Sequence, residues 1–174
     1  MYNIDYYFRL LRNNTNTARD INNIRWEFVK ELNARTVLDY GCGVGWFKAF
    51  APEGIEVDTY DILPVPQTGI TKDSYDLITF WDVLEHIPDF NSLKINIKQA
   101  RYIACSVPLL SNHEFGIEDI LKWKHFKPGE HLHFWRKDIF ESIFKYYDFK
   151  KIKEEQPECP PREDIWNFIF AFDG

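Results

Sequence analysis

The sequence has few cysteines and no long hydrophobic run. Its three cysteines, Cys42, Cys105 and Cys159, have a spacing that matches neither a disulfide framework nor a CxxC zinc site. No apolar stretch approaches the roughly 20 residues that span a bilayer, and polar residues interrupt the aromatic N-terminal segment, which argues against a signal peptide. We therefore expect a cytoplasmic protein that is neither inserted into a membrane nor secreted.

Positive charge is not in excess either. The chain has 21 Lys and Arg against 27 Asp and Glu, a formal net charge of −6, so binding of nucleic acid or anionic lipid would need a local basic patch. Aromatic residues are abundant instead, at 17% of the chain, and they provide enough bulky apolar surface for a substantial core. Because a domain usually takes about 100 to 200 residues, we expect a single domain over residues 1–174.

Strand-like and helix-like segments alternate along the chain. The β-prone runs cover residues 36–40, 55–60, 76–80, 102–107, 149–155 and 166–172. Apolar residues at helical spacing predict N-terminal helices within residues 1–35 and a further helix from Asp138. This alternation predicts an α/β fold with a doubly wound, mainly parallel sheet. The long irregular stretch over residues 109–137 predicts a lid over the substrate.

Three closely spaced glycines follow the first predicted strand, where residues 37–45 read VLDYGCGVG. In a doubly wound sheet the first strand-to-helix turn lies against the ligand and needs glycine for close approach. A dinucleotide site requires G-x-G-x-x-G, but the last position holds the bulky Trp46, and no Gly-Lys-Ser/Thr follows for a Walker loop. A carboxylate two residues before the turn suits a ligand that has a cationic amine and no phosphate.

This run resembles motif I of class I S-adenosylmethionine-dependent methyltransferases. The resemblance implies that Asp39 helps to hold the methionine amine, often through water. It also implies that Asp61, which ends the second strand, accepts hydrogen bonds from both ribose hydroxyls, for which a carboxylate has two oxygens. Further cofactor contacts implied by the resemblance are Gly41, Cys42, Gly43 and Gly45 beneath the cofactor, Ile62 on the adenine face, and Trp81.

A second matching run, YDLITFWDVLEHIP over residues 75–88, is similar to the segment after strand four in the small-molecule branch that includes ubiquinone-pathway O-methyltransferases. Only fourteen residues separate Asp61 from Asp76, where the family usually fits a helix, a strand and an acid that contacts the adenine amine. We therefore expect a Rossmann-like methyltransferase sheet that is shortened between strands two and four. The N-terminal helices, or a second copy in a homodimer, would cover the shortened edge.

Asp82, Glu85 and His86 have the i, i+3, i+4 spacing of one helix face, and two interpretations compete. In the first, Asp82 is an N-cap and Glu85 its reciprocal partner in a capping box. In the second, the three residues and the distal His131 bind a divalent metal. That set resembles the Glu-x-x-Glu-His plus distal His of small-RNA terminal 2′-O-methyltransferases. We favour the capping box and predict no bound metal.

Three histidines are candidates for the catalytic base. Methyl transfer to oxygen requires the acceptor hydroxyl to lose its proton as it attacks, and a histidine with a pKa near neutrality is the usual base. His86 follows the strand that ends beside the expected methyl group, while His131 and His133 belong to the predicted lid. An amine acceptor with a free lone pair would need no base. The lid also carries basic residues that predict an anionic acceptor: Lys122, Lys124, Lys127, Arg136 and Lys137.

The favoured prediction is an enzyme that transfers a methyl group from S-adenosyl-L-methionine to an oxygen of a small or carrier-linked molecule and releases S-adenosyl-L-homocysteine. One alternative is a noncatalytic S-adenosylmethionine-binding domain with a regulatory or assembly role. Another is a metal-dependent nucleic-acid 2′-O-methyltransferase, which the acidic net charge disfavours.

Overall fold

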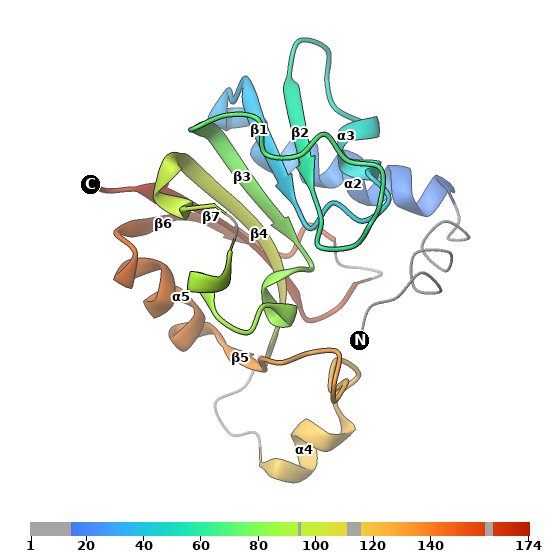
Figure 1. Ribbon diagram of the computed structural model, residues 1–174. Helices are drawn as coiled ribbons and strands as arrows, with labels where there is room; N and C mark the ends of the chain where they lie inside the picture. Colours follow the sequence, from blue (N-terminus) through green and yellow to red (C-terminus); the bar gives the residue numbers. More distant parts are fainter. Residues whose placement is uncertain (1–14, 94, 111–115, 159–161) are drawn as a thin grey trace.

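The fold is built on a mixed sheet with helices on both of its faces (Figure 1). The computed structural model describes residues 15–93, 95–110, 116–158 and 162–174. Within these residues the strands are β1 (Thr36–Tyr40), β2 (Glu56–Tyr60), β3 (Tyr75–Trp81), β4 (Ala100–Leu110), β5 (Trp135–Arg136), β6 (Phe149–Glu155) and β7 (Ile165–Phe172). The predicted bounds of the first strand and of the strand over 149–155 agree with β1 and β6.

The strands follow the order β2-β1-β3-β4-β7-β6, and β5 pairs with β4 outside this path. β2, β1, β3 and β4 are mutually parallel, while β7 runs antiparallel to both β4 and β6. Strands covered on both faces are apolar almost throughout, as in the run Leu77-Ile78-Thr79-Phe80-Trp81 of β3. The predicted α/β fold with a mainly parallel sheet is confirmed.

Helices lie on both faces of the sheet. They are α2 (Thr15–Val29), continued by the 3-10 turn η1 (Lys30–Leu32), α3 (Trp46–Ala49), α4 (Ile117–Lys122) and α5 (Lys137–Tyr146), with further 3-10 turns η2 (Leu84–His86), η3 (Phe90–Ser92) and η4 (Ile97–Gln99). α2 and α3 pack on one face and α5 on the other. The sheet is therefore doubly wound as predicted. Residues 1–14, where an earlier helix was predicted, lie outside the described residues.

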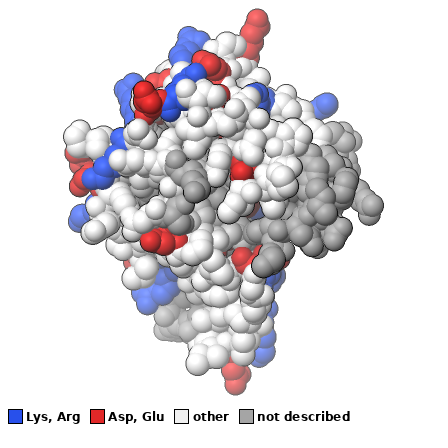
Figure 2. Space-filling view, viewed as in Figure 1, with Lys and Arg blue, Asp and Glu red and all other residues white. Residues whose placement is uncertain are grey.

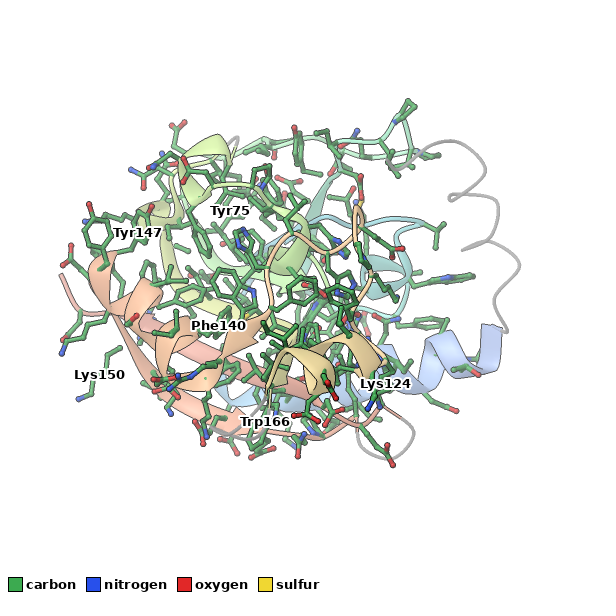
Figure 3. The ribbon with its side chains drawn as sticks, turned by 90° about the horizontal axis from the view of Figure 1, so that it is seen from below. Tyr75, Lys124, Phe140, Tyr147, Lys150 and Trp166 are labelled. Carbon is green, nitrogen blue, oxygen red and sulfur yellow. The ribbon has the colours of Figure 1, made fainter. Side chains whose placement is uncertain are left out.

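Aromatic side chains fill both layers between helices and sheet. On the α2 side, Trp26 and Phe47 stack with ring centroids 4.1 Å apart. On the α5 side, Phe144 stacks on Phe170 of β7 at 4.0 Å, beside the fully buried Phe140. Figure 3 shows Phe140 in the interior and Lys150 of β6 at the margin. Because stacked aromatic rings bury a large area, both layers hold the central strands firmly and fix where their ends lie.

The chain between β2 and β3 is short, as predicted. Residues 61–74, all of which are described, contain no helix or strand. Part of this loop runs along the outer edge of β2: Thr59 N–H donates to Oγ1 of Thr68 at 2.8 Å, and Gly69 N–H donates to the Thr59 carbonyl at 3.0 Å. The loop thus bonds to this edge, and α2 packs on the face of the sheet, while the expected cover by the first N-terminal helix or a second copy stays a prediction.

The predicted lid begins later than residue 109, because β4 continues to Leu110. Its described part contains α4 and stands off the sheet beside β5 (Figure 1). Two backbone bonds attach it to η2, since N–H groups of Leu132 and His133 donate to the Glu85 carbonyl at 2.8 and 3.2 Å. This segment therefore contacts the turn that follows β3, and its role as a lid stays a prediction. Among the residues described, no helix is long and apolar enough to cross a membrane.

Candidate functional site

A cavity of about 510 Å³ opens at the carboxyl ends of β1, β2 and β3. Parallel α/β sheets bind ligands at this edge, and the volume is within the range of small-molecule sites. The cavity is lined by most residues predicted to contact the cofactor, namely Asp39, Gly41, Cys42, Gly43, Asp61, Ile62 and Trp81. Gly45 does not line it and occupies the N-cap of α3. His86 of η2 also lines the cavity.

The glycine turn is wedged between the ends of β2 and β3. The N–H groups of Gly41 and Cys42 donate to the Tyr60 carbonyl at 2.7 and 3.1 Å. Gly41 has φ +81°, and a Cβ atom at this residue would lie 2.4 Å from Cγ2 of Val83. Only glycine meets both conditions without strain. Burial raises the pKa of the Cys42 thiol to about 12, so this side chain is no nucleophile.

Asp61 is held directly over the glycine turn. Its Oδ2 accepts from Gly43 N–H and its Oδ1 from Leu63 N–H, both at 2.8 Å. A carboxylate has about four acceptor positions, so each oxygen keeps capacity for a hydroxyl donor. The neighbouring Ile62 is 87% exposed and gives the open side of the cavity an apolar surface.

Asp39 is a buried acid whose residue is 2% exposed. Burial raises its pKa to about 7, although Oγ1 of Thr79 donates to it at 3.0 Å and Arg25 attracts its charge. Desolvation penalises the ionised form, so the carboxyl is partly protonated at neutral pH. A cationic group that enters the cavity beside Asp39 would favour ionisation, which is the property expected of a site for an amine.

Arg25 of α2 also lines the cavity, and the sequence reading missed it. Its guanidinium lies over the ring of Trp81, 5.0 Å from the centroid, and donates to Oδ2 of Asp82 at 2.7 Å and to Oε1 of Glu158 at 3.0 Å. The sequence feature that could have identified Arg25 is its place on the apolar face of a predicted helix, four residues before Val29. A buried arginine stays charged, so its burial requires acceptors that offset the loss of contact with water.

The structure contradicts the capping box. η2 is a 3-10 turn whose N-cap is Val83, with no side-chain cap bond, while Asp82 stands before it with φ +58°. The Asp82 carboxylate instead accepts two bonds from Arg162, at 3.0 and 2.7 Å, as well as the bond from Arg25. These two arginines hold the pKa of Asp82 below its usual range even though burial opposes this. Attraction by two cations outweighs the local capping tendency.

Three of the four metal candidates lie together. Each of Glu85, His86 and His131 offers one ligand atom, and these atoms are all within 4.8 Å of one another, whereas Asp82 belongs to the arginine pairs. Oε2 of Glu85 and Nδ1 of His131 are buried and have no hydrogen-bond partner among the described residues. Buried polar atoms are normally satisfied, and a carboxylate with two imidazoles is a donor set that divalent transition metals accept. The residues therefore fit a metal ion.

His86 is in the neutral form, which can accept a proton. Its Nδ1 lies 2.7 Å from the Glu130 carbonyl, which only accepts, so the ring donates there and carries its lone pair on Nε2. Burial lowers the pKa of His86 below its ordinary value and lowers that of His131 to about 4. Both rings are neutral at pH 7, and their centroids are 4.7 Å apart.

His133 is separated from this pair. Its Nε2 bonds to the Ile87 carbonyl at 2.8 Å, and its ring stacks on Trp135 with centroids 4.5 Å apart. This histidine attaches the lid to the segment after η2. Of the three predicted bases, the structure brings His86 and His131 together and gives His133 a structural contact.

The basic residues of the lid mostly have acidic neighbours. Lys124 lies 3.5 Å from Glu163, and Lys127 lies 3.7 Å from Glu130. Arg136 and Lys137 likewise pair with acids. On the face seen in Figure 2, charged side chains gather mainly at the periphery and the central surface is mostly uncharged. These pairs offset most of the positive charge that predicted an anionic acceptor.

We predict that Gly41→Ala destabilises the protein by about 2–4 kcal/mol, because the new methyl group adds a clash with Val83 to the strain of a positive φ. Gly69→Ala is the matched control, since Gly69 also has φ +81° but no atom within 4 Å of the added Cβ. It should cost about 1–2 kcal/mol. Urea unfolding of both variants measures the difference, and equal losses would show that the contact with Val83 is not tight.

Comparison with known proteins agrees with this geometry. A family model described as "Methyltransferase domain" matches residues 7–154. No curated protein sequence gives a significant match.

Similar solved structures include three methyltransferases. The methyltransferase domain of bacterial CtHen1 is 18% identical with a TM-score of 0.57, over 91% of this chain and 100% of that chain. Magnesium protoporphyrin IX methyltransferase from Synechocystis PCC 6803, with S-adenosylhomocysteine bound, is 16% identical with a TM-score of 0.58, over 89% and 83%. An S-adenosylmethionine-dependent methyltransferase from Clostridium acetobutylicum ATCC 824 is 11% identical with a TM-score of 0.61, over 94% of each.

Because the identities are this low, the solved structures show only a shared fold. The assignment to a family rests on the family model. It covers well over half of the chain and includes the glycine turn, Asp61 and the Leu-Glu-His turn. The chain therefore belongs to the methyltransferase-domain family, and the protein is an S-adenosylmethionine-dependent methyltransferase.

Proposed function

We propose that the enzyme methylates an oxygen of a small or carrier-linked molecule, with His86 as the base. The observation that carries this proposal is a neutral, mostly buried histidine at the wall of the cofactor cavity, with its lone pair on Nε2. An oxygen acceptor must lose a proton as it attacks, and a base at this position would take that proton. An amine acceptor with a free lone pair would not require it.

The charges of the cavity suit the amino-acid end of the cofactor. We assign the methionine amine to Asp39 and the methionine carboxylate to Arg25, since one buried anion and one buried cation both line the cavity. Nε1 of Trp81 supports the presence of a polar ligand, because this buried donor has no hydrogen-bond partner among the described residues. Pairing both charges of a zwitterion offsets the cost of removing them from water.

The other end of the cofactor belongs at Asp61 in this proposal. The two carboxylate oxygens accept from the two ribose hydroxyls, and the exposed apolar surface of Ile62 packs on the adenine ring. With the methionine end and the ribose assigned in this way, the sulfonium lies between the glycine turn and the segment after β3, which contains His86.

The transfer is a single displacement. A lone pair of the acceptor oxygen forms the bond to the methyl carbon while the carbon–sulfur bond breaks and its electrons stay on sulfur, giving S-adenosylhomocysteine. The hydroxyl proton moves to Nε2 of His86. The predicted lid is attached to the segment that carries His86, through the Glu85 carbonyl and through His133.

A second candidate is metal-assisted transfer to a hydroxyl group. The specific observation is the cluster of Glu85, His86 and His131, with two buried ligand atoms that lack hydrogen-bond partners in the described part of the chain. A bound divalent ion lowers the pKa of a coordinated hydroxyl. Burial, reinforced by Asp82, raises the pKa of Glu85 well above its usual range, and a cation would restore the ionised form. A nucleic-acid acceptor remains disfavoured by the acidic net charge.

We predict that Asp61→Ala weakens binding of S-adenosylhomocysteine by about 1–3 kcal/mol, because buried ribose hydroxyls lose their acceptors. Asp73→Ala removes the same charge from an exposed position in the same loop and should leave affinity unchanged. Calorimetric titration of wild type and both variants measures this. Equal affinity in wild type and Asp61→Ala would show that the ribose lies elsewhere.

We predict that His86→Ala folds normally and loses about 10²–10⁴-fold in turnover of a hydroxyl acceptor, the usual contribution of a base. Acceptors are found by screening hydroxylated small molecules for formation of S-adenosylhomocysteine. Because burial lowers the pKa of His86 below 6.5, the wild-type rate should stay constant from pH 8 to 7 and fall only below that ordinary value. His125→Ala, in the lid, is the control; full turnover in His86→Ala would refute the base assignment.

The second candidate predicts that the wild-type protein binds one Zn²⁺ or Mn²⁺ in a calorimetric titration. Binding should be lost in Glu85→Gln and His131→Ala, because each removes one of three ligands, and kept in His125→Ala. Absence of binding to the wild type would eliminate metal assistance and leave His86 as the base.

A further inference from the structure

The outer edge of β2 is hydrogen-bonded at Thr59, and at Asp61 just beyond it, to backbone and side-chain groups of the short loop that follows. The inward side of the strand serves the glycine turn, through the carbonyl of Tyr60. On the outward side, Thr59 bonds to Thr68 and Gly69, as described above, and Thr68 N–H returns a bond to Oγ1 of Thr59 at 3.0 Å. Strand edges carry donors and acceptors that require partners, and this loop supplies them.

On the outward side, both backbone groups of Asp61 hydrogen-bond to one side chain. The Asp61 N–H donates to Oε1 of Gln67 at 2.8 Å, and the Asp61 carbonyl accepts from Nε2 of Gln67 at 3.2 Å. A primary amide has the same donor and acceptor pair as a peptide group. The Gln67 amide therefore takes the place that a peptide group of a neighbouring strand would occupy beside Asp61.

This contact matters because Asp61 lies beyond the end of the sheet pairing. The register between β1 and β2 ends at Tyr40 and Tyr60, so no further strand pair holds the Asp61 backbone. The carboxylate is oriented by N–H groups of Gly43 and Leu63. Gln67 adds a third restraint, on the backbone of Asp61 itself.

We propose that Gln67 is a positioning residue that orients Asp61 toward the ribose hydroxyls of the cofactor. The proposal rests on the assignment of Asp61 to the ribose in the proposed function. Gln67 does not line the cavity and is exposed, so it acts through Asp61 and not through contact with the cofactor. Its loss should reduce the preference for ligands that carry ribose hydroxyls, with little effect on the rest of the site.

The test compares S-adenosylhomocysteine with its 2′,3′-dideoxy analogue by calorimetry. We expect wild type to bind the hydroxylated ligand about tenfold or more tightly, as buried hydroxyls with charged acceptors require. In Gln67→Met, which keeps the chain length and removes the amide, and in Gln67→Ala, this ratio should fall to about threefold or less. The fall should come from weaker S-adenosylhomocysteine binding, with the analogue unchanged. Gln99→Met, at another exposed glutamine, should keep the wild-type ratio.

A wild-type ratio in both Gln67 variants would overturn the inference while leaving the ribose assignment intact. Equal weakening of both ligands would also overturn it, because a general loosening of the loop, and not the orientation of Asp61, would then be the cause. No discrimination by the wild type would instead refute the ribose assignment, and this inference with it. Thermal unfolding of each variant separates these results from loss of folding.

Discussion

The burial of a carboxyl group near the carboxyl end of β1 is the constraint around which the site is organised. Asp39 stands on β1, between β2 and β3, in a sheet covered on both faces. An ionised group is costly there unless it is paired, and Thr79 provides only a neutral donor. The pKa of Asp39 is raised because burial penalises its ionised form. A ligand with a protonated amine is the partner that such a position favours.

The same constraint explains the ion pairs around the cavity. Arg25 brings a positive charge near Asp39, and as a buried cation it requires acids of its own, which Asp82 and Glu158 provide. Arg162 then balances these two acids. α2, the segment after β3 and the loop between β6 and β7 are thereby tied together. Each of the four groups pairs with two opposite charges, so removing any one of them leaves two buried or half-buried groups with one partner fewer.

Local sequence was sufficient for the parts of the site that depend on local backbone geometry. The glycine turn and the acid at the end of β2 were predicted because positive φ angles and strand ends leave clear signals in neighbouring residues. The resemblance to motif I implied the contacts of Asp39, Gly41 and Asp61, and their place at one cavity agrees with the rule that the carboxyl ends of parallel strands meet at one edge.

The parts that sequence reasoning missed depend on contacts between distant segments. Arg25 and Arg162 bond to Asp82 from 57 and 80 residues away, and Arg25 bonds to Glu158 across 133 residues. Pairing over such distances leaves no periodic pattern in the sequence. The capping box failed for this reason, because a local rule was overridden by long-range charge. The hydrogen bonds from the adjoining loop to Thr59 and Asp61 were not predicted, because they depend on how this loop folds back along the strand.

The most direct test of this account is the number of protons exchanged when S-adenosylhomocysteine binds at pH 7. Titration calorimetry in two buffers of different ionisation enthalpy measures it, for wild type and for Asp39→Asn. Because the ligand amine should lower the pKa of Asp39 from about 7, we expect wild type to release a fraction of a proton on binding and the variant to release none. Tight binding with no proton release from the wild type would contradict the account, since Asp39 could not then be the group that receives the amine.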